Sequence, residues 1–168
     1  MPLQLRFWKT QDQSVILNWR NHQETRKNSL NRKKIQKAKH ATWFHSVLTN
    51  PKRHLGFLAY NCKKQKIGVV RFSRRKKGQT WEIHFIVAPK NRGHGLAQGM
   101  IQKAIKKIKK RLPNTYLTAK VKLTNPKSLH ILESLGFKKT KTKNGIRHLR
   151  LCDRSKTESK IEKVAKKK

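Results

Sequence analysis

Short stretches in which apolar and polar residues alternate recur along the chain and predict β-strands. The clearest extends from Trp81 to Val87, where Ile83 and every second residue lie on one apolar face, and Pro89 ends it. Its apolar end predicts a central position in a sheet. We expect six further strands, at residues 3–8, 54–60, 67–73, 115–121, 136–140 and 146–151. The polar segment NCKKQK joins the second and third of these into a predicted hairpin.

Helices are predicted where apolar residues recur every three or four positions. The longest of them sets an apolar stripe from Leu96 to Leu112 against a row of lysines. Strands and helices that follow one another in this way predict an α/β fold with a mixed sheet. The other helices are expected at residues 15–20, where Thr10 or Asp12 supplies the cap, from Gln36 to Leu48, and from Asn125-Pro126 to Leu135.

The length of 168 residues suits one domain, which we expect at residues 1–151, followed by a basic tail at 152–168 that is disordered or partly helical. No run of eighteen apolar residues occurs and the N-terminus lacks the apolar segment of a secretory signal, so cytoplasmic localisation without a membrane span is predicted. Cys62 and Cys152 lie far apart without neighbouring metal-ligand pairs. Neither a disulfide framework nor a metal site is therefore expected.

The chain carries 44 lysines and arginines against 7 acidic residues, which gives a formal net charge of +37. A balance this basic indicates anionic partners, among them nucleic acid, anionic membrane surfaces and phosphorylated ligands. The charge is spread along the whole chain, whereas a binding arm would concentrate it. Nucleic acid is therefore one candidate partner but not the favoured one, because the basic residues are not interleaved with the aromatic residues of a stacking platform.

A glycine-containing loop separates the strand that ends at Val87 from the helix that begins at Leu96. Gly93 and Gly95 allow a tight bend and a close backbone approach, and the start of the helix presents unpaired N–H groups and a positive dipole end. These features predict a site for a pyrophosphate. The loop matches neither the dinucleotide fingerprint, because Gln98 stands where a third glycine is needed, nor the P-loop, which requires Gly-Lys-Ser/Thr.

Two motifs carry a resemblance to the GNAT family of N-acetyltransferases. RGHGLA from Arg92, preceded by VAP, resembles the family's R-x-x-G-x-G/A signature, and NPKS from Asn125, followed by GF at 136–137, is similar to its later N-x-x-A/S and G-F segment. Together with the order of strands and helices, the resemblance covers nearly all of residues 3–151. It implies a mixed, mostly antiparallel sheet flanked by helices, a splayed central strand pair, and acetyl-CoA as the co-substrate without a metal.

The resemblance also implies how the chain would hold acetyl-CoA. The backbone of the central strand would pair with the pantetheine arm as an added strand does, and the loop would wrap the pyrophosphate. Arg92 would add positive charge there and His94 would contact phosphate. Asn125 would bind the pantetheine region or the cofactor's amide, with a plain helix cap as the alternative. The implied cofactor-binding set is Phe85, Val87, Arg92, Gly93, His94, Gly95, Leu96, Ala97, Gln98, Asn125 and Ser128.

The implied reaction is the direct attack of a neutral primary amine on a thioester, which needs a base for the amine and donors for the oxyanion. Glu82 lies on the strand beside the cofactor and is our first catalytic candidate, with a salt-bridged structural carboxylate as the alternative. His84 shares its face and is the second candidate, as a base or a substrate ligand. Leu132 stands where many members carry a tyrosine as general acid, so the thiolate would leave unassisted or be protonated by water or another group.

The front half of the chain resembles the branch that acetylates amino groups on nucleotide-linked sugars in pseudaminic and related nonulosonic acid pathways. WRN from Trp19, RKNS from Arg26, HATWF from His40 and GVVRF from Gly68 carry this resemblance. It implies that the acceptor is a UDP-linked 4-amino-4,6-dideoxy sugar whose diphosphate pairs with arginine. The implied substrate-binding residues are Trp19, for which core packing is the alternative, Arg20, Asn21 and Arg26.

Two other functions stay open at this point. One keeps the acetyltransferase fold but acetylates protein N-termini or lysines, as ribosomal-protein acetyltransferases do. The other is a non-catalytic basic module that associates with RNA or the ribosome, which Leu132 and the net charge of +37 both favour. The oligomeric state is not predicted.

Overall fold

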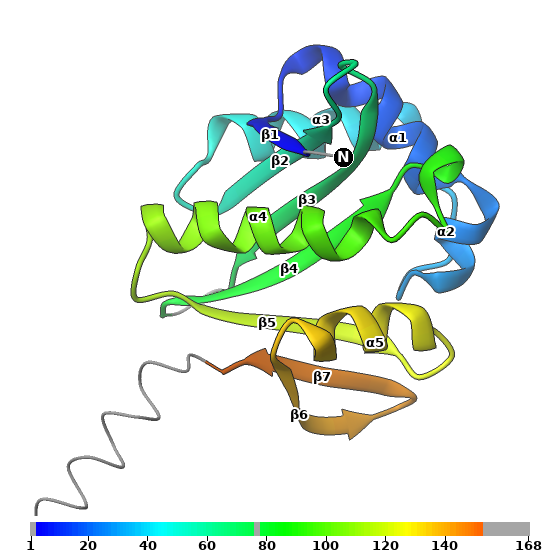
Figure 1. Ribbon diagram of the computed structural model, residues 1–168. Coiled ribbons are helices and arrows are strands. Elements are labelled where there is room, and N and C mark those ends of the chain that lie inside the picture. The colour runs from blue at the N-terminus through cyan, green and yellow to red at the C-terminus, as the bar shows by residue number, and fades with distance from the viewer. Residues whose placement is uncertain (1–2, 76–77, 153–168) are drawn as a thin grey trace, which may run out of the picture.

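The computed structural model describes residues 3–75 and 78–152, and the predicted tail lies outside them apart from Cys152. Seven strands form one sheet in the order β1-β2-β3-β4-β5-β7-β6 (Figure 1). All neighbouring strands pair antiparallel except β4 and β5, which are parallel. The strands are β1 (Gln4–Phe7), β2 (His54–Tyr60), β3 (Lys66–Arg74), β4 (Thr80–Val87), β5 (Tyr116–Lys122), β6 (Phe137–Lys143) and β7 (Ile146–Leu151).

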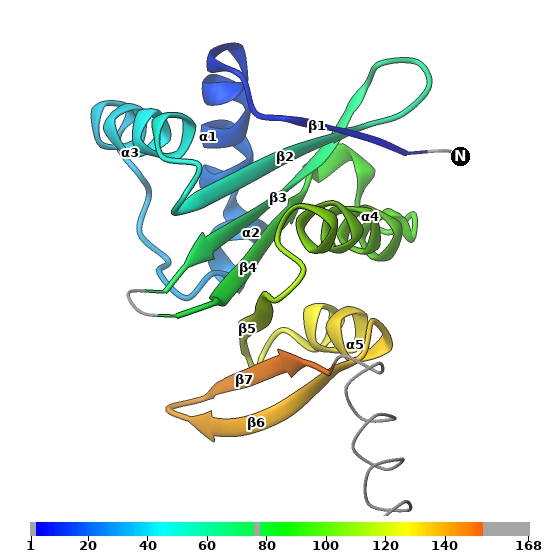
Figure 2. The same cartoon turned by 90° about the vertical axis from the view of Figure 1, so that its left-hand side faces the viewer.

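Helices cover the two faces of the sheet unequally, as Figure 2 shows. One face carries three helices over the half of the sheet that contains β2 to β4, and the other carries two helices that pack on its centre and on the β5 end. The first group is α1 (Gln13–Asn21), α2 (Gln23–Asn28) and α3 (Lys37–Thr49), and the second is α4 (Leu96–Arg111) and α5 (Pro126–Ser134). Short 3-10 turns, η1 (Thr10–Asp12) and η2 (Pro89–Asn91), precede α1 and α4.

The alternation of β4 produces two separate hydrophobic cores. Trp81 and Ile83 belong to the larger core, together with Met100 and Ile101 of α4. Ile86 points to the opposite face and packs against the smaller core under α1 and α3. The predicted central strand is therefore confirmed, and its second face is half-buried.

The parallel pair β4–β5 separates soon after it begins. The two strands pair only from Thr80 to Glu82 on β4 and from Tyr116 to Thr118 on β5. Beyond these residues β4 pairs with β3 alone and β5 with β7 alone, so the two strands diverge, and we call the divergence between them the slot. This is the predicted splayed pair, and it leaves backbone groups of β4 up to Val87 without a partner from β5.

Two local features differ from the prediction. Helix α2 was not expected, because QETRKN has no apolar periodicity that would indicate a helix. Asp12 stands at the predicted N-cap position of α1, but its side chain makes no capping bond to that helix and instead binds Arg6, Lys66 and the backbone of Lys9. None of the described helices is long and apolar enough to cross a membrane.

Candidate active site

The loop between β4 and α4 has the backbone of an anion-binding turn. Gly93 and Gly95 have φ angles of 81° and 67°, and Gly95 is the residue that precedes α4 in a left-handed conformation. Other residues rarely adopt these angles, so the glycines are required by the backbone. Leu96, Ala97 and Gln98 form the first turn of α4, whose N–H groups have no partner within the helix. The loop therefore offers exposed backbone donors to an anion.

The side chains of the loop fasten it to the rest of the site. Arg92 donates to the carbonyl of Val87 at 3.4 Å and to the hydroxyl of Thr25 in α2. The Nδ1 atom of His94 lies 2.8 Å from the carbonyl oxygen of Arg92, and its ring is exposed. Arg92 thus links the end of β4 to α2, in addition to bringing its charge beside the loop.

Asn125 and Ser128 stand across the slot from β4, where β5 ends and α5 begins. The Oδ1 atom of Asn125 accepts a hydrogen bond from the Ser128 backbone at 3.2 Å, which confirms that Asn125 caps α5. On the opposite wall, Phe85 and Val87 turn half-buried side chains toward the larger core and leave their backbone at the open edge of β4. Both walls of the slot thus come from segments with a predicted cofactor role.

Glu82 lies on the other face of β4, at the last residue that pairs with β5. Its Oε2 atom is 3.2 Å from Nζ of Lys120, its Oε1 atom is 3.7 Å from Nε2 of His84, and 13% of its side chain is exposed. The structure therefore brings both predicted catalytic residues together at the point where the slot opens. Lys120, which the sequence did not single out, completes the cluster.

Arg71 of β3 stands directly opposite His84 in the sheet. Its guanidinium lies 5.1 Å from the centre of the Trp43 ring and donates to the hydroxyl of Ser73. Burial lowers the pKa of Arg71 to about 10, and the charge of Glu82 opposes this shift. A basic residue within the apolar strand IGVVRFS is the signal that could have identified this position.

The same cations determine the chemistry of His84. Burial, followed by the positive charges of Arg71 and Lys120, lowers the pKa of His84 far below its ordinary value. A neutral imidazole at neutral pH donates or accepts a hydrogen bond but is a weak base. A neutral His84 would hydrogen-bond a ligand and not accept its proton, which leaves Glu82 as the candidate proton acceptor.

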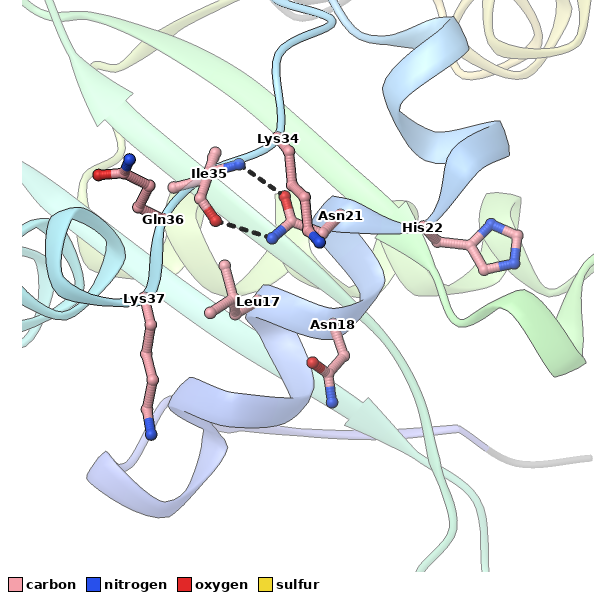
Figure 3. Close-up of a pocket in the computed structure, with 8 residues that line it drawn as sticks. All are labelled: Leu17, Asn18, Asn21, His22, Lys34, Ile35, Gln36 and Lys37. Atoms are coloured by element: carbon pink, nitrogen blue, oxygen red, sulfur yellow. Dashed lines mark hydrogen bonds between the residues drawn. The ribbon is translucent and has the colours of Figure 1, made fainter.

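The predicted acceptor residues lie around α1, and most of them hold the loop at residues 29–36. Asn21 exchanges two hydrogen bonds of 2.8 Å with the backbone of Ile35 (Figure 3). Arg20 donates to the carbonyl of Asn31, and Arg26 to those of Asn21 and Arg32. The hollow beside this loop has a volume of about 690 Å³ and is lined by Leu17, Asn18, Asn21, His22, Lys34, Ile35, Gln36 and Lys37.

Two other predicted positions are explained by packing. Trp19 packs against the smaller core, which agrees with the alternative given for it. Leu132 is 1% exposed within the larger core, so no proton donor stands at this position of α5. Within the described part of the chain, no group of three or more potential metal ligands is assembled.

Comparisons with known proteins agree with this architecture. Residues 3–138 match the family model described as the acetyltransferase (GNAT) domain. Spermidine N-acetyltransferase from Vibrio cholerae, solved with CoA and spermine, superposes with a TM-score of 0.79 at 20% identity over 89% of this chain and 94% of its own. The yncA protein of Salmonella typhimurium, solved with its cofactor acetyl-CoA, gives 0.74 at 19% identity over 90% and 94%. No curated protein matches the chain significantly.

Proposed function

The chain belongs to the GNAT acetyltransferase family, and we propose that it acetylates a primary amine on an anionic small molecule, namely a nucleotide-linked amino sugar. The chain is an acetyl-CoA-dependent N-acetyltransferase, so the acceptor is the open question. One observation carries the proposal: Arg71 and Lys120 stand beside the carboxylate of Glu82 on the acceptor side of the slot, and Lys122 lies farther along the same face of β5.

The cofactor would lie along the slot. Its pyrophosphate would bind the backbone donors from Gly93 to Gln98, and its pantetheine arm would pair with the free edge of β4 near Phe85 and Val87. This course would bring the thioester to the divergence of β4 and β5, beside Glu82. The backbone donors of the loop and the free edge of β4 support a cofactor site. The pantetheine arm is an extended chain with amide groups, and an unpaired strand edge offers hydrogen-bond partners for such a chain.

The chemical step would then proceed by direct attack. The amine nitrogen bonds to the thioester carbon, the carbon–sulfur bond breaks, and the amine proton passes to Glu82 directly or through water. The thiolate leaves without an acid at Leu132, which is acceptable because a thiol with a pKa of about 8.5 is a fair leaving group. His84 would hydrogen-bond the acceptor near the amine.

Electrostatics distinguishes the possible acceptors. Spermidine and spermine carry several positive charges, and a site for them needs carboxylates. Among the described residues, Glu82 is the carboxylate that the strands contribute to this face, and it is already paired with Lys120, while Glu24 of α2 lies near Arg92. A sugar diphosphate brings two negative charges, which guanidinium and ammonium groups bind well. The charge of Arg71, Lys120 and Lys122 therefore favours an anionic acceptor over a polyamine such as the spermine bound in the Vibrio cholerae enzyme's structure.

A competition between acceptors tests the proposal. We would incubate the protein with acetyl-CoA and, in separate reactions, a UDP-linked 4-amino-4,6-dideoxy sugar, spermidine, and a peptide with a free N-terminus and a lysine. CoA thiol release gives the rate and mass spectrometry identifies the acetylated product. We expect the sugar to be acetylated at least tenfold faster than either alternative at equal concentration. Acetylated spermidine or peptide with an untouched sugar would refute the proposed acceptor.

Arg71 provides a matched pair of variants for the same assay. Arg71→Met should raise KM for the nucleotide sugar about tenfold, because one charge-assisted contact is worth about 1.5–3 kcal/mol. Arg71→Lys keeps the charge and should recover much of this loss. Acetyl-CoA binding should not change in either variant, since Arg71 lies on the acceptor side of the sheet. An unchanged KM in Arg71→Met would remove this residue from acceptor binding.

A further inference from the structure

The strands β5, β7 and β6 align their basic residues in three rows. Thr118, Arg150 and Lys138 stand opposite one another across the three strands, and so do Lys120, His148 and Lys141. The third row consists of Lys122, Ile146 and Lys143. Residues that pair directly share a face of the sheet. We call the surface made by Lys120, Lys122, Lys138, Lys141, Lys143 and Arg150 the basic sheet face.

The basic sheet face is the side of these strands that α4 and α5 leave uncovered. Leu117, Ala119 and Val121 alternate with its β5 residues and are buried in the larger core beneath α4 and α5. Figures 1 and 2 show that α1, α2 and α3 lie over the other half of the sheet. Among the described residues, α2 reaches β5 through one bond, from Nζ of Lys122 to the carbonyl of Lys27. No helix of the described chain covers the face over β7 and β6.

The charge of this face is not neutralised locally. The acidic residues of the described chain are Asp12, Glu24, Glu82 and Glu133, and only Glu82 borders the face, through its pairing with Thr118. Burial, followed by the positive charges of Lys141 and Lys120, lowers the pKa of His148, which lies between them. Lys138, Lys141, Lys143 and Arg150 are all exposed. Lys120 is paired with Glu82, and the other five cations therefore repel one another and would be stabilised by a bound polyanion.

This positive charge exceeds what the reaction requires. A nucleotide sugar brings two phosphates to the slot, where Arg71, Lys120 and Lys122 already stand. The cations of β6 and β7 extend away from the slot across two more strands, each about 4.8 Å from the next. Along each strand, successive rows are about 7 Å apart. Regularly spaced cations on an open face are suited to bind a long anion whose negative charges repeat along its length.

From this arrangement we propose that the basic sheet face binds single-stranded nucleic acid through its phosphates. The guanidinium of Arg150 lies 4.4 Å from the centre of the Tyr116 ring, so a planar cation is held at one end of the face. Bases of unpaired strands stack on such guanidinium planes. An anionic membrane would instead favour apolar side chains that insert, and the exposed large apolar residues of the described chain, Phe7, Leu30 and Leu123, are not on the face.

Two triple variants with equal charge change separate this face from the general charge of the protein. Lys138→Gln, Lys141→Gln and Lys143→Gln remove three exposed lysines from β6, and Lys103→Gln, Lys106→Gln and Lys107→Gln remove three from α4. Binding of a labelled 20-nucleotide oligouridylate to the full chain is followed by fluorescence anisotropy at several salt concentrations. The same proteins are sedimented with phosphatidylserine vesicles.

The parent protein should bind the oligonucleotide with a Kd of about 1–10 μM near physiological salt. The β6 triple variant should bind at least tenfold more weakly, and its salt slope should fall by about 2, because each lost phosphate contact removes about 0.7. The α4 triple variant should stay within threefold of the parent.

Three results would overturn the proposal: equal losses in the two triple variants, a parent Kd above about 100 μM, or a β6 triple variant that loses vesicle binding while it keeps RNA binding. The single variant Lys141→Gln tests the proposal even if the triple variant does not fold. It should weaken RNA binding about threefold, since Lys141 lies in the central row.

Discussion

Lys120 of β5 places its Nζ atom 3.2 Å from the carboxylate of Glu82, at the last position where β4 and β5 still pair. The contact joins the two strands just before they diverge, so the carboxylate is fixed at the mouth of the slot. The side chain of Glu82 is only 13% exposed, and the ammonium of Lys120 compensates its negative charge there. The carboxylate of Glu82 is therefore both a partner in this ion pair and the proposed base. Variants of Glu82 and of Lys120 separate the structural role from the catalytic one.

Glu82→Gln should reduce kcat by about 100-fold or more, which is the range that a positioned base contributes. Lys120→Met keeps the carboxylate and should retain most of kcat at saturating acceptor, while KM for the acceptor rises because Lys120 also belongs to the proposed acceptor site. Steady-state kinetics with the accepted amine measures both variants, and a thermal shift with acetyl-CoA checks that the cofactor still binds. Equal turnover in Glu82→Gln and the parent would leave Glu82 with a structural role alone.

Gly95→Ala should weaken acetyl-CoA binding about tenfold, because φ of 67° is unfavourable for alanine and the loop would have to move. The parent should gain about 2.7 kcal/mol of stability from acetyl-CoA at 100 times its Kd, measured as a rise in melting temperature. Gly145→Ala in the β6–β7 turn, where φ is 69°, is the matched control. It should lose similar stability without losing affinity, and a loss of affinity there would contradict the specific role of the 93–95 loop.

His40 should make the protein sensitive to mild acid. It is 1% exposed, both ring nitrogens lack a hydrogen-bond partner, and burial lowers its pKa. Above pH 6.5 the ring is neutral in the folded and unfolded states, and below this pH the unfolded state takes up the proton first, so stability falls. Urea unfolding should show that His40→Phe reduces the loss between pH 7.5 and pH 5 by up to about 2 kcal/mol.

The exposed His45 on the same helix provides the control for this measurement. The difference between the two pH values measured in His45→Gln is the baseline against which His40→Phe is compared. An equal loss of stability in His40→Phe and the parent would show that other groups cause the acid sensitivity.

Asp12→Ala should be more destabilising than the loss of a surface ion pair, at about 2–3 kcal/mol, because it removes the buried partner of Arg6 and Lys66, which are themselves partly exposed. Burial alone would raise the pKa of Asp12, but hydrogen bonds from Arg6, Lys9 and Lys66 outweigh it and lower the pKa to about 2. Its contribution is therefore complete above pH 4 and is lost as the pH falls toward 2.

Chemical denaturation of Glu133→Gln supplies the comparison for Asp12. Glu133 is 45% exposed and pairs with Arg147 at 3.3 Å, so its loss should cost less than about 1 kcal/mol. If both substitutions had the same effect, the burial of Asp12 would not explain its contribution.

Local patterns account for the features that were predicted correctly. The alternation from Trp81 to Val87 identified the central strand, and the stripe from Leu96 to Leu112 identified α4, because side-chain direction follows a fixed period along each element. Helix α2 was missed because its stability depends on the neighbours that hold it. Thr25 receives a bond from Arg92, and the carbonyl of Lys27 receives one from Lys122.

The sequence by itself determined the family, the sheet with its central strand, and the anion-binding loop at Gly93 and Gly95, since these depend on spacing along the chain. Only the tertiary structure decided what surrounds Glu82. Arg71 comes from β3 and Lys120 from β5, and strand order is fixed by packing between distant segments. The same pairing turned scattered lysines into the basic sheet face, because strands in register place side chains that are far apart in the chain on one surface.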